Sequence, residues 1–331
     1  MRRTPSWFLW SLLAVCGSAC REQAFREPLK LGGKLVPAAT LNRGKEGYTL
    51  YCRACHGDNG DGTGPAAAGY RPPPRDFTSG LFKFAAVASG GLPRDDDLRR
   101  SVRYGLHGTA MLAWDVGDSD LDAILQYLKT FSPRWRDEEP GEAIVPSADP
   151  WEPQRGEPQR GGPDRADEAI ARGGKVYHAV AQCSSCHPAY ETRQGIDQAS
   201  RELNGGSAAS FRSDLYAAEA KDSDYLDKGS PAADGGWVRL KLLAPDFLFN
   251  QLRSVRDLGD RTSASVDLYR VIAAGIGGTA MPSWQGALPE GDLWALAYYV
   301  RSLALLRDTP GAAHLRERLL TQPRWEPAVG R

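Results

Sequence analysis

Cys52-Arg53-Ala54-Cys55-His56 and Cys183-Ser184-Ser185-Cys186-His187 are the two stretches that decide the fold of this chain. Each is a Cys-X-X-Cys-His pentapeptide, the pattern by which a c-type haem is attached to protein. In this pattern the two thiols add to the haem vinyl groups, and the adjacent imidazole coordinates the iron from the proximal side. A lone Cys-X-X-Cys would also fit a disulfide, a redox pair or half a zinc site, but two copies that are each followed by His favour covalent haem. The sequence therefore predicts two haem c groups, held by Cys52, Cys55 and His56 and by Cys183, Cys186 and His187.

The distal ligands are predicted from the rarity of methionine. The chain contains 3 Met residues, and apart from the initiator they are Met111 and Met281, which lie in the repeated phrase Gly-Thr-Ala-Met-X-X-Trp. A Met in a helical stripe usually fills a core, whereas small neighbours on a loop let a thioether approach an iron closely. Met111 and Met281 are therefore predicted as axial ligands, and His/Met ligation suits one-electron transfer. We interpret the remaining histidines as surface or structural residues: His107, whose position in the second copy is Gly277, and also His178 and His314.

The chain is an internal repeat. A shift of 170 residues aligns Asp76-Phe77 with Asp246-Phe247, and Met111 with Met281, without a gap. The distance from the haem motif to the Asp-Phe pair is 39 residues longer in the second copy, which indicates an insertion at about 189–237. Its polar composition predicts a solvated loop or a short helical excursion, and a docking surface is the alternative.

Each copy is predicted to be mostly helical. Apolar periodicity is clearest in the closing helices of the two copies, and Gly residues in the opening helices would permit a close helix crossing. Proline-rich stretches at 71–77 and 243–247 predict extended loops. The predicted helices cover residues 42–51, 95–104, 118–131, 169–177, 265–274 and 290–306.

Both copies resemble class I cytochrome c domains, over about 41–131 and 167–306. The whole chain is similar to the di-haem cytochrome c proteins and subunits of bacterial respiratory chains. This resemblance implies an all-α fold of two tandem class I cytochrome c domains joined by a Pro-rich linker. It also implies redox protein partners, with a quinol-oxidising complex or a dehydrogenase as electron donor and a terminal oxidase as acceptor.

The N-terminus reads as an export signal. Arg2-Arg3 precede an apolar run that is too short to span a bilayer, and small residues precede Cys20. We expect acylation at Cys20, with ordinary signal cleavage or an uncleaved anchor as alternatives, which places the protein on the periplasmic side as a membrane-anchored lipoprotein. The expected organisation is a signal peptide at 1–20, a tether at 21–38, a first domain at 39–135, a linker at 136–165, a second domain at 166–308 and a tail at 309–331.

Charge and site symmetry narrow the function. Lys plus Arg and Asp plus Glu are both 41, so no global field favours nucleic acid as a partner. The sequence predicts an electron carrier that makes and breaks no bonds. The alternative is a di-haem enzyme, such as a peroxidase or a sulfur-compound dehydrogenase, which would need one haem with an open position. The two methionine phrases are nearly identical, which favours the carrier over the enzyme and over a gas-binding sensor.

Overall fold

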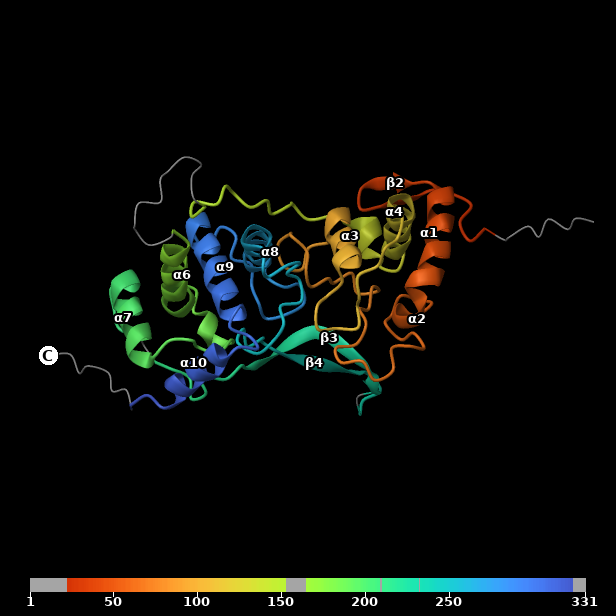
Figure 1. The fold of residues 1–331 in the computed structure, drawn as a ribbon. Helices are drawn as coiled ribbons and strands as arrows, with labels where there is room; N and C mark the ends of the chain where they lie inside the picture. Colours follow the sequence, from red (N-terminus) through yellow and green to blue (C-terminus); the bar gives the residue numbers. More distant parts are fainter. Residues whose placement is uncertain (1–22, 153–164, 209, 232, 324–331) are drawn as a thin grey trace, which may run out of the picture.

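The computed structural model describes residues 23–152, 165–208, 210–231 and 233–323 (Figure 1). The predicted signal peptide with Cys20, part of the predicted linker and the end of the tail lie outside these ranges. Two large hydrophobic cores define a first unit, 23–137, and a second unit, 165–323, and a smaller third cluster lies within the second unit. Within the described ranges no helix has the length and apolar character needed to cross a membrane.

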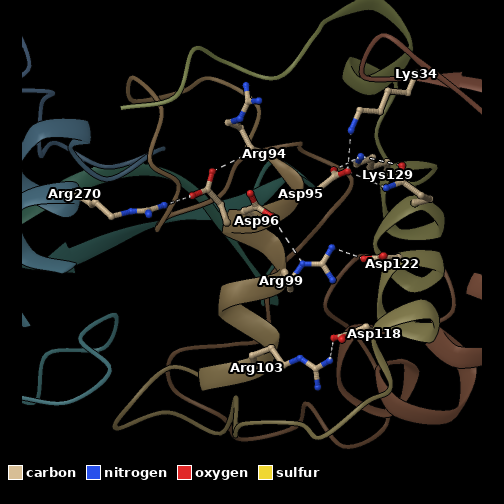
Figure 2. Close-up of polar contacts among 12 residues, drawn as sticks. Lys34, Arg94, Asp95, Asp96, Arg99, Arg103, Asp118, Asp122, Lys129 and Arg270 are labelled. Carbon is tan, nitrogen blue, oxygen red and sulfur yellow. Dashed lines mark hydrogen bonds and ion pairs between the residues drawn. The ribbon is translucent and has the colours of Figure 1, made fainter. Parts of the chain in front are cut away.

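The first unit is built around three helices and a short strand pair. Its elements are β1 (Leu29–Leu31), β2 (Lys34–Val36), α1 (Ala38–Tyr51), α2 (Arg53–His56), α3 (Asp95–Tyr104), α4 (Asp118–Lys129) and α5 (Arg134–Asp137). Ion pairs between α3 and α4 fasten these helices together, among them Arg99 with Asp122 and Arg103 with Asp118 (Figure 2). The residues that were predicted to form a tether, 21–38, contain the antiparallel pair β1–β2. Gly32 of this pair donates to the carbonyl of Trp135 at 2.6 Å.

The second unit repeats this plan with additions. Its elements are α6 (Arg165–Lys175), the π-helical η1 (Val176–Val180), the 3-10 turn η2 (Cys183–Ser185), α7 (Arg193–Asn204), β3 (Ala220–Pro231), β4 (Trp237–Leu243), α8 (Arg261–Ala274), α9 (Glu290–Ala304) and α10 (Pro310–Leu320). The six predicted helices are confirmed, with ends displaced by a few residues. The polar tail contains α10, which buries Leu319.

Two small antiparallel sheets correct the all-α expectation. Besides β1–β2, strands β3 and β4 pair in a long hairpin. This inserted hairpin, with α7, occupies the segment that the sequence predicted to be a loop or helical excursion; the helical part is confirmed and the loop prediction is wrong. In Figure 1 the hairpin runs beneath both units, from α10 to the neighbourhood of α2. Strand β3 is mostly polar and β4 is mostly apolar but largely exposed, and the two strands pair with each other along those surfaces.

The opening and closing helices of each unit cross at a glycine. A Cβ atom on Gly44 of α1 would lie 2.0 Å from the carbonyl oxygen of Ala123 in α4, and one on Gly173 of α6 would lie 2.0 Å from that of Ala295 in α9. Only glycine permits this approach of two helix backbones. From the crossing glycine to the first cysteine the second unit is two residues longer, Gly173 to Cys183 against Gly44 to Cys52. The π-helical stretch η1 lies in this longer segment and takes up the added length.

The two units pack through reciprocal ion pairs. Asp97 accepts a hydrogen bond from Arg270 at 3.0 Å, and Arg270 reaches from the second unit toward α3 (Figure 2). The counterparts of these residues, Asp267 and Arg100, form the matching ion pair in the opposite direction. Because Asp97 and Asp267, like Arg100 and Arg270, stand 170 residues apart, the interface has the self-complementary character of a two-fold dimer contact.

Residues 138–152 of the predicted linker lie along both units rather than hanging free. Ile144 donates to the carbonyl of Ala86 at 2.8 Å in the first unit. The indole of Trp151 donates to the carbonyl of Gly291 at 3.1 Å in the second. The described part of the linker is thus an extended strap fixed at both ends.

Candidate haem sites

The proximal histidines are held in the same way in both units. The imidazole Nδ1 of His56 lies 3.0 Å from the carbonyl oxygen of Arg75, and Nδ1 of His187 lies 2.9 Å from that of Pro245. A carbonyl only accepts, so Nδ1 carries the proton and Nε2 keeps its lone pair for a metal. Burial lowers the pKa of both imidazoles, which keeps them neutral at pH 7. Each histidine is therefore oriented and protonated as an iron ligand.

A phenylalanine stacks on each of these imidazoles. The ring centroids of His56 and Phe77 are 4.5 Å apart with an interplanar angle of 20°. Those of His187 and Phe247 are 4.8 Å apart at 24°. The two phenylalanines belong to the repeated Asp-Phe pair, which aligns the two copies of the sequence. Their recurrence at the same offset was the signal that they serve the site.

The four motif cysteines are compatible with the attachment of a haem. All four motif cysteines are free and half-buried. Burial raises the pKa of the Cys52 and Cys183 thiols to about 12, so as free thiols they remain protonated and unreactive as thiolates. Within the part of the chain that the structure describes, no three or more His, Cys, Asp or Glu side chains gather as a metal site. The donor set thus fits a covalently held haem and lacks the further ligands of a zinc site.

The methionine loops have one backbone design. Leu106 donates to the carbonyl of Met111 at 2.8 Å, and its counterpart Ile276 donates to that of Met281 at 3.2 Å. In each loop the threonine hydroxyl accepts from the methionine amide, at 3.1 Å from Thr109 and 3.2 Å from Thr279. The loops begin and turn at glycines with positive φ: Gly105, Gly108, Gly275 and Gly278.

Each methionine loop lies close to its own haem motif. Trp114, three residues after Met111, makes an edge contact with Tyr51 next to the first motif, with ring centroids 6.0 Å apart. Met281 and Cys183 pack against the same hydrophobic core. The segment after Met111 thus lies beside the first haem motif, and Met281 and Cys183 share one core in the second unit.

The two haem motifs differ in what satisfies their backbone carbonyls. In the first unit the tight loop after the motif does so, since Gly62 donates to the carbonyl of His56 at 2.9 Å. In the second unit the Arg212 side chain from the insertion donates to the carbonyls of Ser184 and His187, both at 2.8 Å. Arg212 had no sequence signal, because the first unit contains no counterpart of it.

The other histidines lie where they were expected. His178 is buried, its Nδ1 donates to the carbonyl of Gly174 at 2.7 Å, and its Nε2 accepts from the Tyr190 amide at 3.1 Å. Burial lowers the pKa of His178 to about 4. With both ring nitrogens occupied it is structural. His314 is exposed on α10, and His107 is half-buried at the interface between the units.

Comparison with known proteins finds a family match over the first unit. Residues 39–128 match the family described as cytochrome C oxidase, cbb3-type, subunit III. A solved structure, titled as the Kuenenia stuttgartiensis reducing HAO-like protein complex Kustc0457/Kustc0458, contains a similar chain. It is 27% identical with a TM-score of 0.52, and the match covers 79% of this chain and 95% of that chain. No curated protein matches the sequence. The cytochrome c domain at residues 39–128 implies a covalently bound haem c.

Proposed function

We propose that the chain is a di-haem c-type cytochrome that carries single electrons between exported or membrane-attached redox partners, toward a terminal oxidase. The observation that carries this proposal is the repetition of the site geometry. Both proximal histidines have Nδ1 bonded to a carbonyl, and both methionine loops have the same hydrogen bonds. With an imidazole and a thioether on each iron, no position would be left for a substrate.

The side chains of this chain keep each haem in place and dry. A haem iron supplies one-electron chemistry by alternating between the ferrous and ferric states. Phe77 and Phe247 hold the imidazole planes, and the carbonyls of Arg75 and Pro245 hold their orientation. Fixed ligands change little in geometry between redox states, which favours fast transfer over chemistry.

A second candidate is a role inside an oxidoreductase complex. The similar solved chain belongs to a complex titled HAO-like, and the match covers nearly all of that chain. Our chain would then exchange electrons with a catalytic partner subunit. A di-haem enzyme in its own right needs an asymmetry at the iron, and the hydrogen bonds of the two methionine loops give no support for one.

Ligand binding tests the proposal. The reduced holoprotein should contain two haems and bind no carbon monoxide, whereas Met111→Ala or Met281→Ala should open one haem each and lower its midpoint potential. Haem content, carbon monoxide difference spectra and redox titration measure these outcomes. Ready carbon monoxide binding by the unmodified protein would contradict the carrier and support the enzyme.

The proposed location is the periplasmic side, with a lipid on Cys20 as the anchor. Cys20→Ser should move the protein from the membrane fraction to the soluble periplasmic fraction, while Cys16→Ser should leave it in place. Membrane retention of the Cys20→Ser protein would remove the lipid anchor. Partners that remain with the anchored protein in mild detergent would identify the donor and the acceptor.

A further inference from the structure

The inserted hairpin carries one buried aromatic residue between the two units. Tyr225 of β3 is 7% exposed, although its strand is otherwise polar. Its hydroxyl donates to the carbonyl of Gly277 at 2.5 Å, and the neighbouring amide of Asp224 donates to the carbonyl of Gly278 at 2.9 Å. The contact is close, because a Cβ atom on Gly278 would lie 2.9 Å from the Tyr225 ring. The hairpin thus holds two successive peptide units of the second methionine loop.

The face of the same ring contacts the first unit. The guanidinium carbon of Arg75 lies 3.8 Å from the ring centroid of Tyr225, and the Lys83 ammonium lies 4.7 Å from it. Cations over an aromatic face are attracted by its quadrupole. Arg75 is the residue whose carbonyl accepts a hydrogen bond from the His56 imidazole. One side chain therefore touches the proximal loop of the first site and the distal loop of the second.

Among the described residues, no tyrosine supports the first methionine loop in this way. At the position that matches Gly278, a Cβ atom on Gly108 would meet only Gln251, at 3.4 Å. The matching position of Gly277 is His107, whose amide donates to the carbonyl of Arg253 at 3.0 Å. The two loops thus share their internal hydrogen bonds. The contacts of Tyr225 with the second loop, which we call the tyrosine clamp, are the difference between them.

The geometry points to Tyr225 as a positioning residue that locks the Met281 loop onto the second haem and joins it to the proximal loop of the first haem. This inference rests on the proposed di-haem function. Without the hydroxyl, the buried carbonyl of Gly277 loses its partner, and the loop gains freedom to lift the methionine away from the iron. We therefore expect the second haem to bind an outside ligand more weakly with the clamp than without it.

The test is titration of the oxidised holoprotein with imidazole, followed optically. Loss of one buried hydrogen bond is expected to raise the affinity of the second site for imidazole about tenfold in Tyr225→Phe, with the first site unchanged. To assign the affinity change to one haem, Tyr225→Phe is combined with Met111→His or with Met281→His. Each histidine substitution closes one iron with a second imidazole, so only the other haem can bind added imidazole. Tyr225→Leu also removes the ring from Arg75 and should shift the midpoint potential of the first haem, which Tyr225→Phe should preserve.

Tyr70→Phe is the matched control, because Tyr70 is 39% exposed on the first unit and its ring takes part in no described contact. In the unmodified protein the amides of the 275–281 loop should exchange hydrogen more slowly than those of the 105–111 loop. Equal exchange, or an imidazole affinity of Tyr225→Phe equal to that of the control, would overturn the clamp. A single haem, or carbon monoxide binding by the unmodified protein, would instead overturn the proposed function.

Discussion

The two units differ in their surroundings far more than in their interiors. Both cross two helices at a glycine, stack a phenylalanine on a histidine and build the methionine loop with the same hydrogen bonds. Only the second unit has a π-helical stretch, Arg212 against its haem motif and a tyrosine against its methionine loop. The repeated features are those that holding a haem would require, and the unrepeated ones would give the two proposed sites separate properties.

The shared helix crossing should be the most sensitive feature. Gly44→Ala and Gly173→Ala each place a methyl group 2.0 Å from a carbonyl oxygen of the partner helix. We expect each to lower the free energy of unfolding by about 3 kcal/mol or more, because both helix backbones must move apart. Guanidinium unfolding of the holoprotein, followed by haem absorbance, measures this. Gly206→Ala, with nothing within 4 Å, is the control, and an equal midpoint in all three variants would show that the crossing tolerates a side chain.

The reciprocal interface should be weaker on one side. The Asp267 carboxylate is 0% exposed and pairs with both Arg100 and Arg256, whereas Asp97 pairs with Arg270 alone. Asp267→Asn should therefore lower the free energy of unfolding by about 3 kcal/mol, since two cations lose their partner, and Asp97→Asn by less. Calorimetry of both variants tests the order. An equal loss in the two variants would mean that the interface is symmetric in energy as well as in sequence.

A smaller contrast lies beside the crossing glycines. Arg172 makes a bidentate ion pair with Asp292 at 2.7 and 2.8 Å, and the aspartate side chain is 10% exposed. Its counterpart is the single bond from Arg43 to Asp120, where both side chains are about half exposed. Asp292→Asn should cost about 1–2 kcal/mol of unfolding free energy and Asp120→Asn under about 0.5 kcal/mol. Urea unfolding with 1 M salt as a second condition measures both, and a larger effect for Asp120→Asn would reverse the ranking.

A pH dependence of stability is expected from one unit alone. Burial, with Arg75 and Arg253 nearby, lowers the pKa of Lys83 from 10.5 to about 7. Between these values the unfolded chain binds more protons than the folded one, so the free energy of unfolding should rise with pH. Lys83→Met should flatten that slope. The counterpart of Lys83 is Arg253, which stays charged throughout this pH range, so Arg253→Met should leave the slope of unfolding free energy against pH as it is. An unchanged slope in Lys83→Met would exclude Lys83 as the source of the pH dependence.

The sequence predicted the repeated features because repetition itself is the signal. The Cys-X-X-Cys-His motifs, the methionine phrases and the amphipathic closing helices each occur twice, and the helices are confirmed. The reciprocal ion pairs were also within reach. Asp97-Leu98-Arg99-Arg100 and Asp267-Leu268-Tyr269-Arg270 share an Asp-Leu-X-Arg pattern, but a pattern in one chain does not say that the two copies face each other.

The unrepeated features were out of reach for a physical reason. Strand β3 has the sequence AKDSDYLDKGSP, whose polar residues lack the alternation of a half-buried strand. It forms through β4 and through contacts with both units, such as the ion pair of Lys228 with Asp76 at 2.7 Å. Likewise, Ile144 and Trp151 of the linker bond to backbone carbonyls. Every residue has such a carbonyl, so the sequence does not single out these partners.

The strap at 138–152 and the inserted hairpin lie along different edges of the molecule (Figure 1). Two units joined along one edge alone could hinge about that edge. The distance between the two proposed haems would then vary. Because tunnelling rates fall steeply with distance, the second connection would keep the rate of electron exchange between the two proposed haems constant. In the proposed di-haem carrier, docking of a redox partner, rather than an internal opening motion, would then set when an electron leaves.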